Sequence, residues 1–205
     1  MTETQRLILK IASGILDYPG SSAFGDRLQR RKGLAGEVDP RLLAVIQSLV
    51  GPDPLQLEQL YVETFDFNPR HALYVTAQEM GDARERGQAL LEWAALYGAA
   101  GYEVPDGQLA DYVPMLLELT AVRPDVVQQA FIDRLAAACA QIADTLEVEN
   151  PYRPLFDLIV DTLGGQGGQE SNEPRPAHDA AGGLDDLPYP LHYPGTESEH
   201  GRGVS

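Results

Sequence analysis

The stretch that decides the fold is DPRLLAVIQSLVGPDPLQLEQLYVETF, residues 39–65. It contains the dipeptide Asp-Pro twice, and apolar residues follow each copy at spacings of three and four. An aspartate side chain accepts hydrogen bonds from the free N–H groups of a helix's first turn, and proline fits the first helical position because no partner is needed there. The stretch therefore predicts two consecutive helices, 40–50 and 54–65.

Similar patterns continue on both sides of this stretch. Apolar residues at helical spacing predict further helices over 3–16, 23–31, 82–101, 109–121, 124–146 and 151–163. Residues 72–76 are the one apolar run that suggests a strand, but a single strand has no partner to pair with. We expect an all-α, single-domain helical bundle of about 7–9 helices.

The composition changes after residue 163. The segment 164–205 holds nine of the 20 glycines and five of the 15 prolines, and its aliphatic residues are sparse. Such a segment buries too little apolar surface to offset the entropy lost on ordering. We predict a helical domain over 1–163 and a disordered, acidic, Gly/Pro-rich tail over 164–205.

The chain is strongly acidic, with 15 Lys and Arg against 31 Asp and Glu and a formal net charge of −16. This charge repels phosphate backbones and anionic lipid, which argues against nucleic acid or a membrane surface as partner and favours a cationic one. No apolar run is long enough to span a bilayer, and the N-terminus lacks the pattern of a secretory signal. We expect a cytoplasmic protein without direct membrane insertion.

Motifs for catalysis and metal binding are missing from the sequence. The one Glu-x-x-His spacing, Glu197 to His200, lies in the predicted tail, and no phosphate-binding glycine loop is present. His71 has no nearby nucleophile and is expected at the surface. Cys139 stands among alanines and is expected to be a small buried residue. The residues predict no enzyme and no stably bound cofactor or metal.

The segment 61–67 is richer than core packing requires. Tyr61 and Phe65 lie one turn apart on the predicted helix, and Glu63 and Asp66 flank them near its end. Negative charge at a helix C-terminus opposes the helix dipole. Two explanations remain open: Asp66 caps the next segment or pairs with Arg70, or it accepts a cationic side chain of a partner.

Two further segments, 81–87 and 109–118, also stand out. Asp82 is expected to cap the helix that follows it, and Gly87 to allow close approach of a neighbouring helix. Asp111 is expected as the N-cap of the helix that contains Pro114 in its first turn. Tyr112 and Met115 add an adaptable surface next to it.

At these segments the chain resembles the NarJ-type nitrate reductase molybdenum-cofactor assembly chaperones, within the wider TorD/DmsD group. The resemblance rests on residues 61–66, Gly81-Asp82 with Arg86-Gly87, residues 111–114 with Glu118, and residues 155–157, all in the family's order. The chain departs from the family pattern at two places. Family members commonly have Asp-His-Leu-Pro where this chain has Asp111-Tyr112-Val113-Pro114. They often have a histidine where this chain has Met80.

The resemblance implies an all-helical, cytoplasmic, non-enzymatic chaperone. Family members bind the N-terminal peptide of the nitrate reductase catalytic (alpha) subunit and keep it competent for insertion of bis-molybdopterin guanine dinucleotide. The resemblance also implies a role in nitrate assimilation and the binding of unfolded protein. An amphipathic peptide would place its apolar face in a groove between helices and its cations against nearby acids. The candidate peptide-binding residues are Tyr61, Glu63, Phe65, Asp66, Asp111, Tyr112, Pro114 and Met115.

Other functions stay open from the sequence alone. One is a TorD/DmsD-like maturation chaperone for a different molybdoenzyme. Another is an adaptor that binds partners through its tail. A third is a small hydrolase or di-metal bundle, which would need inward-facing carboxylate and histidine sets that the sequence lacks.

Overall fold

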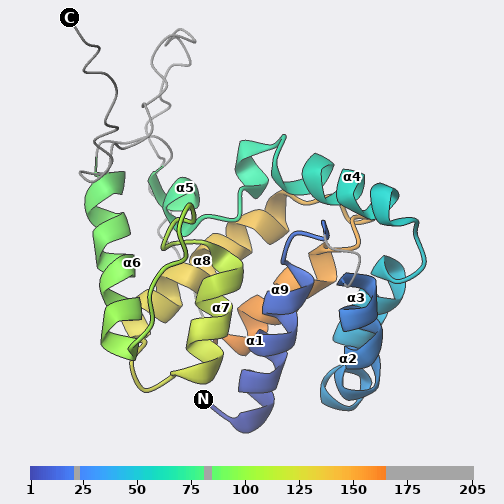
Figure 1. The fold of residues 1–205 in the computed structure, drawn as a ribbon, viewed down its shortest axis with the longest axis horizontal. Helices are drawn as coiled ribbons and strands as arrows, with labels where there is room; N and C mark the ends of the chain where they lie inside the picture. Colours follow the sequence, from blue (N-terminus) through green and yellow to red (C-terminus); the bar gives the residue numbers. More distant parts are fainter. Residues whose placement is uncertain (21–23, 81–84, 165–205) are drawn as a thin grey trace, which may run out of the picture. The chain divides into compact units, whose positions relative to one another are not determined.

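A computed structural model describes residues 1–20, 24–80 and 85–164 (Figure 1). Over these residues the chain forms nine α-helices and one short 3₁₀ turn, and no named strand. The elements are α1 (Glu3–Ile15), α2 (Phe24–Val38), α3 (Pro40–Leu49), α4 (Pro54–Phe65), η1 (Pro69–His71), α5 (Val75–Met80), α6 (Arg86–Ala100), α7 (Val113–Val122), α8 (Gln129–Thr145) and α9 (Arg153–Thr162). The predicted all-α fold is confirmed.

Both Asp-Pro helix starts are confirmed. The Asp39 side chain accepts a hydrogen bond from the backbone N–H of Arg41 at 2.7 Å, and Asp53 accepts one from Leu55 at 2.9 Å. Pro40 and Pro54 follow at the start of α3 and α4. In each helix a free backbone N–H of the first turn thus finds its acceptor two residues earlier in the chain. Local sequence alone therefore determines where α3 and α4 begin.

Helix α1 lies at the centre of the described bundle. It packs most extensively along α7 and also contacts α2, α3 and α9, as Figure 1 shows. Its buried face carries Leu9, Ile11, Ala12 and Ile15, each at most 3% exposed. Removal of this apolar surface from water drives the packing.

Helices α5, α6 and α8 are joined by one arginine. Arg134 of α8 pairs with Glu79 of α5 through two hydrogen bonds of 2.7 and 2.8 Å. Its guanidinium also lies 4.8 Å from the ring centre of Trp93 on α6, and Phe131 packs edge-on against the same ring. The Arg134 guanidinium is therefore held by a carboxylate of α5, an aromatic ring of α6 and an aromatic ring of α8.

The expected strand at 72–76 is a single bridge. Val113 donates its N–H to Leu73, and Val75 donates to Asp111, so Tyr74 and Tyr112 form one isolated antiparallel pair. A partner for this run therefore exists, contrary to expectation, but the pairing stops at once because the chain enters α5 at Val75. Helix α5 itself was not predicted.

The prediction that Asp111 caps a helix is wrong. The N-cap of α7 is Tyr112, which makes no side-chain capping bond. The Asp111 side chain is instead fully buried, and its Oδ2 accepts hydrogen bonds from the Thr76 N–H at 2.9 Å and from the Thr76 hydroxyl at 2.6 Å. Arg86 donates to the same hydroxyl oxygen at 2.9 Å. Asp111 therefore ties the start of α5 to the segment before α7.

Several helix boundaries differ from the prediction. Helix α2 continues to Val38, well past residue 31. Helix α8 begins at Gln129 because residues 124–128 form turns, in which Asp125 pairs with Arg123 and not with a helix start. Helix α9 begins at Arg153, where the Asn150 side chain accepts the Tyr152 N–H at 2.9 Å.

Two single-residue expectations are also corrected. His71 is buried, not at the surface, and its ring nitrogens lie 2.9 Å from the Thr64 carbonyl oxygen and 3.2 Å from that of Thr145. It therefore links the end of α4 to the end of α8. Gly87 faces open space, since a Cβ there would meet nothing within 4 Å. The expected cap at Asp82 lies outside the described residues.

Two other expectations concern α8 and the C-terminal segment. Cys139 is fully buried, as predicted, in α8. Helix α9 ends at Thr162, and Gly164, at a φ of 79°, is the last described residue. The predicted tail beyond it lies outside the described residues.

We expect Asp111→Ala to lower the free energy of unfolding by about 2–3 kcal/mol, because the buried Thr76 N–H and hydroxyl lose their charged acceptor. Urea unfolding followed by circular dichroism measures the change. Asp106→Ala is the matched control, because Asp106 is an exposed aspartate of the same connection. Equal losses in the two variants would contradict a structural role for the Asp111 contacts.

Candidate functional site

The centre of the candidate site is a cluster of aromatic rings around the end of α4. Tyr61 and Phe65 are buried, and their ring centres lie 4.9 Å apart. Tyr152 packs edge-on against Phe65 at 4.9 Å, and Tyr18 packs against Tyr61 at 5.4 Å. Edge-to-face contacts of this kind fix the ring orientations. The predicted shared face of Tyr61 and Phe65 is therefore occupied by residues from the end of α1 and the start of α9.

The Tyr61 hydroxyl connects three segments. It donates to the Leu16 carbonyl oxygen at 3.0 Å, and the Tyr112 hydroxyl lies 3.1 Å away. Since Tyr61 has one proton to give, Tyr112 donates to the Tyr61 oxygen. Burial raises the pKa of Tyr112 to about 12 and also raises the pKa of Tyr61. Both phenols are therefore neutral at physiological pH.

An open pocket of about 330 Å³ borders this cluster. We call it the aromatic pocket. Four tyrosines line it, and Tyr74 packs against Tyr112 with 5.4 Å between ring centres. The lining residues are Tyr18, Tyr61, Phe65, Asp66, Ala72, Leu73, Tyr74, Gln108 and Tyr112. A crevice therefore lies beside Phe65 and Tyr112.

Asp66 is the one carboxylate in the lining of the aromatic pocket. It is exposed at the C-terminal end of α4. Asn68, not Asp66, caps the next turn by accepting the Arg70 N–H at 3.1 Å. Among the described residues Asp66 forms no ion pair with Arg70. Both structural explanations for Asp66 therefore fail, and its charge is available to a partner.

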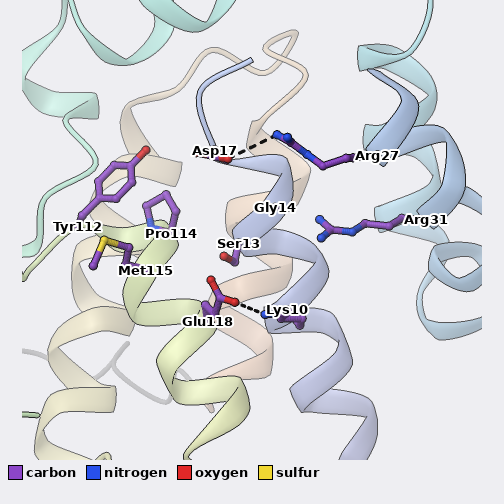
Figure 2. A pocket seen from close by; sticks show the side chains of 10 residues that line it. All are labelled: Lys10, Ser13, Gly14, Asp17, Arg27, Arg31, Tyr112, Pro114, Met115 and Glu118. Carbon is purple, nitrogen blue, oxygen red and sulfur yellow. Dashed lines mark hydrogen bonds and ion pairs between the residues drawn. The ribbon is translucent and has the colours of Figure 1, made fainter. Parts of the chain in front are cut away.

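A second, smaller pocket of about 210 Å³ adjoins Tyr112 on its other side. We call it the charged pocket. Figure 2 shows that its side chains come from α1, α2 and α7, with α1 in the middle. The lining residues are Lys10, Ser13, Gly14, Asp17, Arg27, Arg31, Tyr112, Pro114, Met115 and Glu118. Tyr112 therefore belongs to both pockets.

The structure places six of the eight candidate residues in the two pockets and the other two outside them. The aromatic pocket holds Tyr61, Phe65, Asp66 and Tyr112, and the charged pocket holds Pro114 and Met115 together with Tyr112. Glu63 is exposed on α4 and lines neither of these pockets, and Asp111 is buried beneath the surface.

Sequence reasoning missed Tyr18, Tyr74 and Gln108 in the aromatic pocket. The sequence Tyr18-Pro19-Gly20 predicts only the end of the first helix, and Tyr74 lies in the run 72–76 that suggests a strand. None of the three carries a sequence signal, because single tyrosines and glutamines outside helices are common on protein surfaces.

Two other kinds of site are absent from the described ranges. No group of three or more His, Cys, Asp or Glu residues there is arranged to hold a metal ion. Likewise, none of the helices formed by residues 1–20, 24–80 and 85–164 is long and apolar enough to cross a membrane.

Comparison with known proteins identifies the family. The model of the family described as nitrate reductase delta subunit matches residues 34–157. The chain is 28% identical over 178 residues to the probable nitrate reductase molybdenum cofactor assembly chaperone NarJ of Bacillus subtilis, covering 84% of this chain and 96% of that protein. It is 27% identical over 159 residues to the nitrate reductase molybdenum cofactor assembly chaperone NarJ of Escherichia coli K12, covering 74% and 67%.

A third relative is much longer. The nitrate reductase-like protein NarX of Mycobacterium tuberculosis H37Rv is 32% identical over 147 residues, which are 71% of this chain but 22% of NarX. The chain thus spans about a fifth of that relative. The names of the two NarJ relatives describe assembly chaperones and not catalysts. The resemblance to NarJ-type chaperones is confirmed, and the chain belongs to the nitrate reductase delta subunit family.

Proposed function

We propose that this chain is a system-specific chaperone for a nitrate reductase. It binds the N-terminal peptide of the catalytic alpha subunit in the cytoplasm and keeps that subunit competent for insertion of bis-molybdopterin guanine dinucleotide. The chaperone then leaves and is not part of the final enzyme. The family and the names of the NarJ relatives support the assembly role.

The observation that carries the peptide-binding part is the aromatic pocket with Asp66 in its wall. Its tyrosine and phenylalanine rings offer contact area to an apolar side chain of the peptide. Asp66, which lacks a partner among the described residues, offers a carboxylate to a lysine or arginine next to that side chain. One pocket thus accepts the two features of an amphipathic, cationic peptide.

The net charge acts at longer range. A formal charge of −16 attracts a cationic segment and raises the rate of encounter. The aromatic pocket then supplies most of the affinity, because exposed ion pairs contribute little free energy in water. Binding should therefore be only partly sensitive to salt.

We further propose that the helical domain over 1–163 suffices for this activity. Among the residues that the structure describes, all those lining the two pockets come before residue 119. In this proposal the tail over 164–205 is an appendage to the peptide-binding unit.

The first prediction concerns Asp66. Asp66→Asn should weaken binding of the client's N-terminal peptide by roughly two- to fivefold, because a partly exposed ion pair is worth up to about 1 kcal/mol. Isothermal titration calorimetry measures the affinity, and thermal unfolding should be nearly unchanged.

Glu63→Gln is the matched control for Asp66→Asn. Glu63 lies on the same helix and is also exposed, but it lines neither the aromatic nor the charged pocket. Its loss of charge should change affinity by less than about twofold. An unchanged affinity in Asp66→Asn, or equal losses in both variants, would remove Asp66 from the peptide site.

The second prediction separates the chaperone from an adaptor that works through its tail. Deletion of residues 165–205 should leave the peptide affinity within about twofold of the full chain, because both pockets remain intact. The same calorimetric titration measures it, after circular dichroism has verified the helix content. Loss of binding on deletion would favour the adaptor.

A further inference from the structure

The charged pocket contains three cations and two carboxylates. Glu118 pairs with Lys10, and Asp17 pairs with Arg27 at 3.5 Å, as the dashed lines in Figure 2 mark. The remaining cation is Arg31 of α2, which points toward α1. The local charge is therefore positive, although the protein as a whole is strongly acidic.

Arg31 forms no hydrogen bond or ion pair with the residues that the structure describes, and its Nη1 atom is shielded from solvent. A shielded guanidinium N–H without an acceptor is unfavourable, because it has lost its hydrogen bonds to water and no protein hydrogen bond replaces them. The pocket beside it is open to solvent, so an anionic ligand that enters there would supply the guanidinium with an acceptor.

Gly14 of α1 makes the position of Arg31 possible. A Cβ at residue 14 would lie 1.6 Å from Arg31 Nη1 and 2.8 Å from Cζ, so the guanidinium occupies the space that any other residue would fill. Glycine inside a helix costs about 1 kcal/mol relative to alanine. The glycine and the unpaired arginine together form a built feature of the pocket.

We propose that the charged pocket binds one carboxylate of the client's peptide, on Arg31. This inference rests on the proposed function, and it adds the requirement that the peptide carry an acidic residue. Tyr112 forms part of both pockets, so an extended segment that fills the aromatic pocket reaches the charged pocket within a few residues, at about 3.3 Å each.

The chemistry of the pocket favours a single carboxylate. A guanidinium presents two parallel N–H groups that match the two oxygens of a carboxylate. Asp17 and Glu118 also line the walls, and they repel a second negative charge. In this proposal the client places an apolar side chain in the aromatic pocket and a cation against Asp66. It places a carboxylate against Arg31 in the charged pocket.

The test uses the full chain and the N-terminal peptide of its nitrate reductase catalytic subunit. Each position of the peptide is replaced in turn by Glu and by Gln, and calorimetry measures the affinity of each pair. At one position or at two neighbouring ones, Glu should bind roughly 5–20-fold tighter than Gln. Arg31→Gln should abolish that difference without changing the affinity of the Gln peptide.

Two further variants isolate the Arg31 contact. Arg30→Gln removes the same charge from an exposed neighbour on α2 and should keep the Glu preference. Gly14→Ala displaces the guanidinium and should reduce the preference as Arg31→Gln does, while a better helix former at residue 14 keeps the fold stable.

The outcomes distinguish a failure of this inference from a failure of the proposed function. If the parent peptide binds but no position shows a Glu preference that depends on Arg31, the inference is wrong and the chaperone function stands. If inorganic phosphate binds in an Arg31-dependent way and no Glu peptide does, the occupant is a free oxyanion and the carboxylate proposal is overturned. If the parent peptide does not bind, the proposed function itself fails.

Discussion

The hydrogen bond from the Tyr61 hydroxyl to the Leu16 carbonyl oxygen holds the site together. It seats α4 across the end of α1, and α1 is the helix around which the others pack. The same hydroxyl accepts from Tyr112, which adds the start of α7. Both pockets share Tyr112, so their relative position follows from this pair of phenols. These two linked hydroxyls thus determine how Asp66, the tyrosine rings and Arg31 are arranged relative to one another.

The sequence predicts those parts of the fold that local chemistry decides. Asp39 and Asp53 cap their own helices, and Gly101 ends α6 in the left-handed conformation at a φ of 78°, so neighbouring residues suffice to place these boundaries. Asp111 shows the limit of this reasoning. Its position before a helix fits an N-cap, but the donors to its carboxylate lie 35 residues away on Thr76, and no local pattern contains that contact.

The candidate site was predicted in part for the same reason. Tyr61 and Phe65 share a face by helical geometry, and Glu63, two residues after Tyr61, faces elsewhere, which the same geometry could have indicated. The charged pocket had no such signal. Arg31 and Gly14 meet only because α2 packs on α1, and each alone is an ordinary helical residue. The family resemblance pointed to the segments 61–67 and 109–118 as candidates. It did not indicate how these segments pack against each other or against α2.

The buried thiol of Cys139 has a practical consequence. Only the thiolate reacts readily with alkylating reagents, and burial raises the pKa of this cysteine to about 12. The sequence contains no other cysteine. A cysteine introduced at the rim of either pocket would therefore be the sole reactive one at neutral pH. A fluorophore or spin label could then report on occupancy in an otherwise natural chain.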